Sequence, residues 1–184
     1  SHSYGGSYVD AFFCVKPANK GGYIATGFSN RSLGASPGMF VVITDNTGKL
    51  VKSNIYGSSN SSQGFYVLPH ANPDSGYLVA GYIQETSRVD RDLYLVRINN
   101  DGSVKWERSY GPAGRELNDT VHDAAYCMTS APGGGYYLTG SLKAYNSGGG
   151  KIFLRKVSEK GDSLWTKTYG IGIGYTVTKT TDGN

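Results

Sequence analysis

The stretch GGYIATG, residues 21–27, returns twice in this chain of 184 residues, as SGYLVAG at 75–81 and as GGYYLTG at 134–140. Each copy places a Gly-Tyr pair ahead of a short run of small or apolar residues that ends in a second Gly. Self-similarity of this kind is the signature of a repeat protein, in which each repeat forms one unit of supersecondary structure. The three copies therefore predict at least three repeats of one unit.

The composition indicates that this unit is built from strands. The chain contains 27 Gly and 15 Tyr but only 2 Met, and aromatic residues make up 12% of it. Branched and aromatic side chains suit a pleated strand, and Gly supplies the positive φ that tight turns require. Helical spacing is not sustained over about ten residues anywhere in the chain. We therefore predict an all-β protein.

Each repeat is predicted to hold four strands. In the first repeat the extended segments are AFFCVK (11–16), YIATGF (23–28), MFVVIT (39–44) and LVKSNIY (50–56). A short loop ending in Gly, as at Asp101-Gly102, separates the third segment from the fourth. This pattern is typical of a hairpin whose type I turn is followed by a left-handed Gly. A Tyr-Gly pair closes each repeat, and the four such pairs begin at Tyr4, Tyr56, Tyr110 and Tyr169.

The third segment indicates how the repeats are arranged. When the copies are aligned by their turn Gly, both faces of this segment are apolar; one carries Phe40, Tyr94 and Phe153, and the other carries Met39, Leu93 and Ile152. A strand covered on one side only would alternate apolar with polar residues. We therefore predict that four-stranded antiparallel sheets pack face to face, as the blades of a β-propeller do. The blades are expected at approximately 8–57, 61–111 and 121–170, with 171–184 opening a fourth.

These repeats resemble the bacterial secreted β-propeller repeats. The matching residues in the third copy are Gly135-Tyr136, Gly140, Gly161, Trp165 and Tyr169-Gly170, and the first copy departs from the pattern with Lys52 in place of Trp. The resemblance covers essentially the whole chain and concerns turn and packing positions. It implies a propeller in an exported protein with a periplasmic, cell-surface or extracellular location, and it does not identify a ligand.

The number of repeats leads to an expectation about assembly. A propeller ring closes with roughly 4 to 8 blades, so three blades and the start of a fourth leave the ring partial. Two alternatives follow: further blades of the same polypeptide complete the ring, or a homo-oligomer completes it. The expected partners therefore include more protein of the same kind.

Several classes of function are not indicated. The net charge of +4 comes from 18 basic and 14 acidic residues that are scattered singly, whereas nucleic-acid surfaces show clustered basic residues. No apolar run approaches the roughly 20 residues needed to cross a bilayer. The chain has no metalloprotease HExxH, no CxxC and no serine elbow between a strand and a helix. We therefore predict no catalytic residues, no nucleic-acid partner and no membrane span.

Loops at one end of the expected propeller carry the candidate binding residues. The connection between the second and third repeats, GPAGRELNDTVHDAAY, contains Arg115, Glu116, Asn118, Asp119, His122 and Asp123. The loops between second and third strands contribute Arg88, Asp90, Arg91, Tyr145 and Asn146. Such side chains can bind a sugar or a peptide, and carboxylates with a His suit calcium or another divalent ion. The alternative is a solvated loop in which Asp123, like Asp10, caps a turn; no cofactor motif is present.

The repeat alignment also predicts the state of particular small residues. Cys14 and Cys127 hold the same register two repeats apart, whereas a disulfide needs Cα atoms within about 7 Å. We expect both thiols to be reduced and buried. Gly27, Gly81 and Gly140 share one register as well, and each is expected to occupy a packing position where a side chain would clash.

These observations predict a non-enzymatic binding module that engages carbohydrate or protein through loops at one end of a rigid scaffold. Two alternatives remain open at this stage. The chain could be part of a propeller hydrolase or lyase, or it could be a structural spacer.

Overall fold

The computed structural model describes residues 1–30, 36–57, 60–85, 90–111, 122–142 and 149–180. Its regular structure in these ranges is almost entirely β, with one 3-10 turn at Pro73–Ser75. Twelve antiparallel strands form three separate four-stranded sheets. The predictions of an all-β chain and of four strands per repeat are therefore confirmed.

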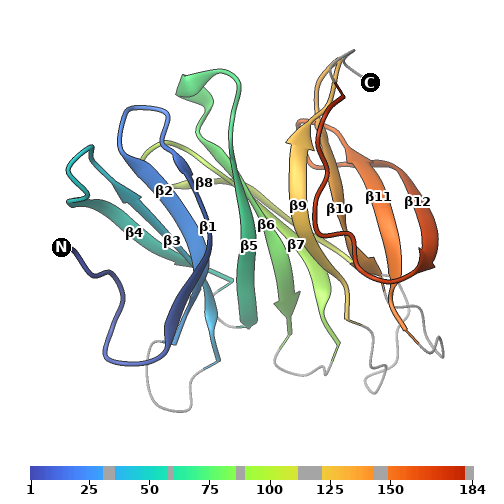
Figure 1. Ribbon diagram of the computed structural model, residues 1–184, viewed down its shortest axis with the longest axis horizontal. Coiled ribbons are helices and arrows are strands. Elements are labelled where there is room, and N and C mark those ends of the chain that lie inside the picture. Colours follow the sequence, from blue (N-terminus) through green and yellow to red (C-terminus); the bar gives the residue numbers. More distant parts are fainter. Residues whose placement is uncertain (31–35, 58–59, 86–89, 112–121, 143–148, 181–184) are drawn as a thin grey trace.

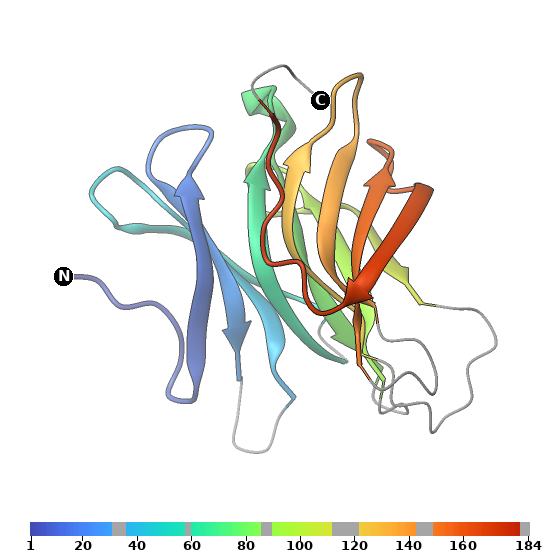
Figure 2. The same ribbon diagram turned by 45° about the vertical axis from the view of Figure 1, so that its right-hand side comes forward.

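In each sheet, strands that are consecutive in the sequence are neighbours in space. The first sheet consists of β1 (Asp10–Pro17), β2 (Tyr23–Ser29), β3 (Gly38–Thr44) and β4 (Leu50–Tyr56). The second consists of β5 (Ser61–Pro69), β6 (Tyr77–Gln84), β7 (Asp92–Ile98) and β8 (Val104–Tyr110). The third consists of β9 (Ala124–Ser130), β10 (Tyr136–Leu142), β11 (Lys151–Val157) and β12 (Ser163–Ile171). The sheets stand side by side, with the N-terminus beside the first and the C-terminal segment beside the third (Figures 1 and 2).

The hairpins that join third and fourth strands have the turn predicted from the sequence. Gly48, Gly102 and Gly161 adopt φ of 82°, 80° and 83°, a region that favours Gly. In the first of these turns the Asp45 side chain accepts hydrogen bonds from the Thr47 N–H at 2.8 Å and the Lys49 N–H at 3.0 Å. Asp45 therefore stabilises the turn itself.

Two apolar clusters hold the sheets together, one between the first and second sheets and one between the second and third. The first includes Met39 and Val41 of β3 with Val96 of β7, and the second includes Leu95 of β7 with Phe153 of β11. Every residue of β3 is buried, and so are six of the seven residues of β7. The prediction that the third strand is covered by a sheet on both faces is thus confirmed for β7, whereas in β3 both faces are buried although only one of them packs on another sheet. In β11 the residues Ile152 and Leu154 are only half-buried, because no further complete sheet covers them among the described residues.

Each first strand contains a β-bulge at the same register. The pairing with the second strand skips one residue, which is Phe13 in β1, Phe65 in β5 and Tyr126 in β9. A bulge leaves its extra residue outside the ladder and bends the strand.

The bulge explains why the second strand needs Gly at this register. A Cβ added to Gly27, Gly81 or Gly140 would collide with a backbone carbonyl oxygen just before the bulge, that of Ala11, Gln63 or Ala124 respectively. The expectation of a tight packing position is confirmed. The obstacle is the backbone of the same sheet, which cannot rotate away as a side chain can.

Successive sheets are also joined by a repeated backbone hydrogen bond. Its three instances, each of 2.8 Å, run from Ser62 N–H to Pro37 O, from Asp123 N–H to Arg91 O and from Gly172 N–H to Gly150 O. The third instance shows that the segment after β12 lies on the third sheet in the way that β5 lies on the first.

A Tyr hydroxyl at the end of a fourth strand reaches the turn of the next sheet. Tyr56 donates to Gly102 O at 2.7 Å, and Tyr110 donates to Gly161 O at 2.5 Å. Tyr4 makes the same contact with Gly48 O. The Tyr-Gly pair that recurs in the sequence is therefore a contact between sheets.

Both cysteines are free thiols, as the register predicted. Cys127 is buried, with 4% of its surface exposed, and its Sγ lies 3.7 Å from Val177 O. Cys14 is only half-buried, so the prediction of full burial was wrong for this residue. Burial nevertheless raises the pKa of the Cys14 thiol, so it is protonated at neutral pH.

We expect Gly81→Val to lower the free energy of unfolding by about 1–3 kcal/mol, the range for overpacking a tight site. The added side chain meets the Gln63 carbonyl, which belongs to the strand ladder. Gly170→Val is the matched control, since no atom lies within 4 Å of a Cβ at Gly170. Urea denaturation of both variants tests this expectation, and equal losses of stability would contradict it.

We expect Tyr56→Phe to lower the free energy of unfolding by about 1 kcal/mol, the usual net contribution of one hydrogen bond. The Gly102 carbonyl keeps a second donor, the Asn54 amide at 2.8 Å, whereas that amide loses its 3.1 Å contact with the Tyr56 hydroxyl. Tyr169→Phe is the control, because Tyr169 is 53% exposed and has no such acceptor among the described residues. Thermal and urea unfolding should separate the two variants; a Tyr169→Phe variant that loses as much would refute the assignment.

Candidate functional site

Aromatic side chains form a row across the first strands of the three sheets. Three are the bulge residues Phe13, Phe65 and Tyr126, and the fourth is Tyr175 in the segment after β12. The ring centroids lie 5.3 Å apart between Phe13 and Phe65, 4.7 Å between Phe65 and Tyr126, and 5.7 Å between Tyr126 and Tyr175. We call these four residues the aromatic row. It exists because each bulge turns one residue out of the strand ladder.

The row is in part open to solvent. Its end members are the most accessible, with Phe13 49% and Tyr175 70% exposed, whereas Phe65 and Tyr126 are half-buried. Burial, with the neighbouring Tyr175, raises the pKa of the Tyr126 hydroxyl. This hydroxyl is therefore a neutral hydrogen-bond donor at physiological pH.

Arg91 lies beside the row. Its guanidinium carbon is 4.3 Å from the centroid of the Tyr82 ring, and this ring contacts Phe65 at 5.8 Å. The pKa of Tyr82 is raised by burial, with the Arg91 charge acting in the opposite direction. Within the described ranges, Arg91 Nε is buried without a hydrogen-bond partner. A cation on an aromatic face is a common element of recognition sites, and here it adds a donor to an otherwise apolar surface.

Four of the candidate binding residues lie in the described part of the chain: Asp90, Arg91, His122 and Asp123, of which Asp123 is buried. Arg91 and His122, from two different loops, form a parallel backbone bridge, and Asp90 precedes Arg91 in a buried position. His122 is exposed. The other predicted site residues lie outside the described residues: Arg88, Arg115, Glu116, Asp119, Tyr145 and Asn146, together with Asn118.

The bridge between Arg91 and His122 accompanies the repeated bond from Asp123 N–H to Arg91 O. The same bond recurs at the equivalent positions of the other two junctions, so the proximity of Arg91 and His122 follows from the packing of the sheets. Within the described ranges, no three His, Cys, Asp or Glu side chains group as metal ligands.

The aromatic row was not predicted from the sequence, although a signal for it was present. The alignment of residues 10–27 with 123–140 places Phe13 opposite Tyr126 without a gap. What the alignment lacked was the bulge, which decides the side of the sheet on which these rings lie.

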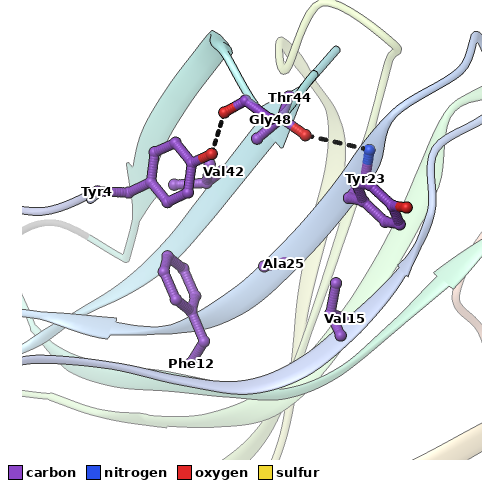
Figure 3. A pocket seen from close by; sticks show the side chains of 8 residues that line it. All are labelled: Tyr4, Phe12, Val15, Tyr23, Ala25, Val42, Thr44 and Gly48. Carbon is purple, nitrogen blue, oxygen red and sulfur yellow. Dashed lines mark hydrogen bonds between the residues drawn. The ribbon is translucent and has the colours of Figure 1, made fainter. Parts of the chain in front are cut away.

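A second feature is an apolar hollow of about 290 Å³ on the outer face of the first sheet. Figure 3 shows the rings of Tyr4, Phe12 and Tyr23 around Ala25. Phe12 stacks on Phe40, with ring centroids 5.4 Å apart and an interplanar angle of 19°. No charged side chain lines the hollow, so it would accept an apolar surface.

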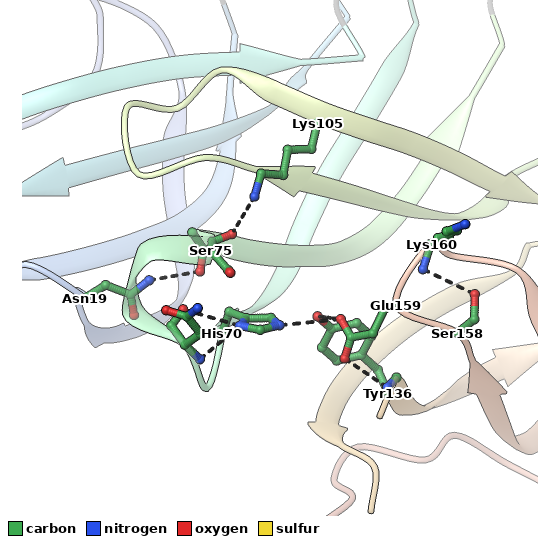
Figure 4. Close-up of polar contacts among 11 residues, drawn as sticks. Asn19, His70, Ser75, Lys105, Tyr136, Ser158, Glu159 and Lys160 are labelled. Carbon is green, nitrogen blue, oxygen red and sulfur yellow. Dashed lines mark hydrogen bonds and ion pairs between the residues drawn. The ribbon is translucent and has the colours of Figure 1, made fainter. Parts of the chain in front are cut away.

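Polar contacts join the second and third sheets at their turn end (Figure 4). His70 Nε2 lies 3.4 Å from a Glu159 carboxylate oxygen. The same carboxylate accepts hydrogen bonds from the Gly135 N–H at 2.9 Å and the Tyr136 hydroxyl at 2.8 Å. Burial alone would raise the pKa of Glu159, but these hydrogen bonds and His70 lower it overall. Glu159 therefore stabilises this junction in its ionised form.

A comparison with known protein families finds no match for this chain, and a comparison with curated proteins finds none either. Over the described residues, no helix is long and apolar enough to cross a membrane. The function of the protein is therefore inferred from the arrangement of its own residues.

We expect the junction at Glu159 to weaken in acid. A carboxyl whose pKa is lowered by folding contributes stability above its ordinary pKa of 4.5, and that contribution is lost as the pH falls through the lowered folded value. Glu159→Gln should remove this component, and because the side chain is 50% exposed, the difference should be only about a few tenths of a kcal/mol.

Urea unfolding measured from neutral pH down to below 4 tests this expectation. Asp74→Asn is the control, since the Asp74 side chain is 83% exposed in its pair with Lys20. A Glu159→Gln variant with the same pH dependence as the native protein would contradict the assignment.

Proposed function

We propose that this protein is a carbohydrate-binding module and that the aromatic row is its binding surface. One observation carries the proposal: four rings at equivalent positions form a continuous row that remains partly open to solvent. Binding sites for small molecules are typically lined by aromatic side chains with a few well-placed polar groups.

The chemistry of a sugar ring fits such a row. The C–H groups on the face of a pyranose carry a slight positive charge and pack on the electron-rich face of an aromatic ring. The end rings of Phe13 and Tyr175 have the most accessible surface for this contact. The hydroxyls of Tyr126 and Tyr175 are positioned to bond with sugar hydroxyls along the same row.

Arg91 supplies the polar group of the proposed site. Its guanidinium lies on the Tyr82 ring, and its Nε is buried without a hydrogen-bond partner among the described residues. A planar donor held in one place binds a ring oxygen or a carboxylate with little loss of side-chain freedom. The predicted loop residues Asp90 and His122 adjoin Arg91 and extend the proposed site toward the loops.

We further propose that the three sheets are successive blades of a β-propeller. The support is that one backbone bond recurs at three successive junctions, including the one made by Gly172. The resemblance to the bacterial secreted β-propeller repeats supports an exported protein. On this proposal, the first strands face the axis of the propeller, and so does the aromatic row.

The experiment that tests binding is an array of neutral and acidic oligosaccharides probed with the native chain, followed by calorimetric titration of the best oligosaccharide. We expect Tyr175→Ala to weaken that binding by about tenfold or more, a loss of roughly 1.4 kcal/mol. Tyr23→Ala is the matched control, because Tyr23 is 52% exposed and lies on the hollow, away from the row.

Two results would overturn the proposal. One is the absence of binding to any oligosaccharide at millimolar concentration. The other is equal weakening by Tyr175→Ala and Tyr23→Ala, which would place the sugar elsewhere. Capture of a protein ligand that depends on Tyr175, without sugar binding, would assign the row to protein recognition.

A further inference from the structure

The hollow on the first sheet corresponds, position by position, to faces that are covered in the other sheets. Val15 and Tyr23 occupy the strand positions of Val67 and Tyr77 in the second sheet, as the pairing of first and second strands shows. Val15 is 61% and Tyr23 52% exposed, whereas Val67 and Tyr77 are 0% and 1% exposed beneath the first sheet. The hollow therefore has the shape and chemistry of a face that receives another sheet.

Tyr4 supports this correspondence. Its hydroxyl donates to Gly48 O, which is the bond that Tyr56 and Tyr110 make with the turn of the following sheet. At the rim of the hollow, Tyr4 thus already makes the contact that an adjoining sheet would make (Figure 3).

One residue of the hollow breaks the correspondence. Phe12 pairs with Gly27, and the residues in this position of the second and third sheets are Gly64 and Ala125. The segment after β12 has Gly174 there, because Gly172 makes the repeated bond two residues earlier. The first sheet therefore carries a large side chain, that of Phe12, at a position that is Gly or Ala elsewhere.

The size of the residue at this position matters because, in the second and third sheets and in the segment after β12, the position faces the second strand of the preceding sheet. A Cβ on Gly64 would collide with Thr26 Oγ1, and a Cβ on Gly174 would collide with Thr139 Oγ1. Between the second and third sheets, Ala80 takes the place of Thr and the facing residue is Ala125; both are fully buried. Thr is matched with Gly and Ala with Ala, so the two positions complement each other in size.

We propose that this pair of positions determines which sheet packs on which, and that Phe12 restricts the hollow to a sheet with Gly at the position of Thr26. The partner is a further four-stranded sheet of the same repeat, apolar on its docking face, whose fourth strand lies where Tyr4 already donates to Gly48 O. A second copy of this chain does not fit, because the face it would present carries Thr139. Head-to-tail association of two copies is thereby prevented, which favours further blades over a homo-oligomer.

The face of the third sheet reinforces this exclusion. It is already occupied by the segment with Gly174, which is bonded through Gly172 to Gly150 O and through Gly174 to Gly140 O. A β1 strand from a second copy would have to exchange with this segment and place Phe12 where Gly174 now fits beside Thr139. The exchange therefore requires a small residue at one of the two positions, either Gly in place of Phe12 or Gly in place of Thr139.

Self-association of the whole chain, measured by sedimentation equilibrium, tests the proposal. The four proteins are the native chain, Phe12→Gly, Phe12→Ala and Thr139→Gly. Phe12→Gly recreates the pair of Gly with Thr, and Thr139→Gly places Gly opposite Phe12. We expect each of these two to associate with a Kd lower than that of the native chain by about tenfold or more. Phe12→Ala is the control that removes the ring but retains the clashing Cβ, so it should remain like the native chain.

Circular dichroism confirms that each variant is folded. Where Phe12→Gly fails to fold, the double variant Phe12→Ala with Thr139→Ala replaces it, because this pair occurs naturally at Ala125 and Ala80. Three outcomes would overturn the proposal. The native chain could self-associate as tightly as Phe12→Gly, Phe12→Ala could associate as tightly as Phe12→Gly, or no variant could associate more tightly than the native chain. Tighter association of Phe12→Gly without tighter association of Thr139→Gly would refute the claim that the partner sheet has Gly at the position of Thr26.

Discussion

The β-bulge in each first strand is the feature on which the remaining structure depends. It brings a backbone carbonyl so close to the second strand that Gly27, Gly81 and Gly140 have no room for a side chain. The bulge also turns one residue out of the ladder and leaves its predecessor facing the preceding sheet. The turned-out residue becomes a member of the aromatic row, as Phe65 does, and its predecessor, Gly64, sets the fit between sheets. One irregularity of the backbone thus shapes both the aromatic row and the packing faces between sheets.

The repeat, the strands and the hairpin turns could be predicted because they depend on short-range chemistry. A Gly such as Gly102 marks a left-handed turn position wherever it follows a type I turn. The apolar residues on both faces of β7 predicted that a sheet lies on each side, and the two apolar clusters confirm this prediction. The same reasoning was less accurate for Cys14, since the register of a residue determines its side of the sheet but not how closely the next sheet covers it.

The proposed binding surface was harder to predict because it depends on a change of register that leaves little trace in the sequence. Simple alternation places Phe12 and Phe13 on opposite faces, but only the bulge shows that Phe12 lines the hollow and that Phe13 joins the aromatic row. The sequence did place Arg91 and His122 at the same end of the molecule. Their contact proves to be part of a backbone pattern common to all junctions, so proximity alone does not distinguish a binding site from a structural one.

A repeat protein must pack its units in the correct order, and the backbone cannot determine that order. The same 2.8 Å bond joins each pair of neighbours and therefore distinguishes none of them. Side chains supply the difference: the Asn19 amide Nδ2 donates to Gly76 O at the first junction, whereas His70 pairs with Glu159 at the second. Polar contacts of this kind at a partly exposed rim contribute little free energy. A steric mismatch within a packed interface costs more, typically about 1–3 kcal/mol. Discrimination between sheets is therefore strongest where the interface is tightest, which is the position held by Phe12, Gly64 and Ala125.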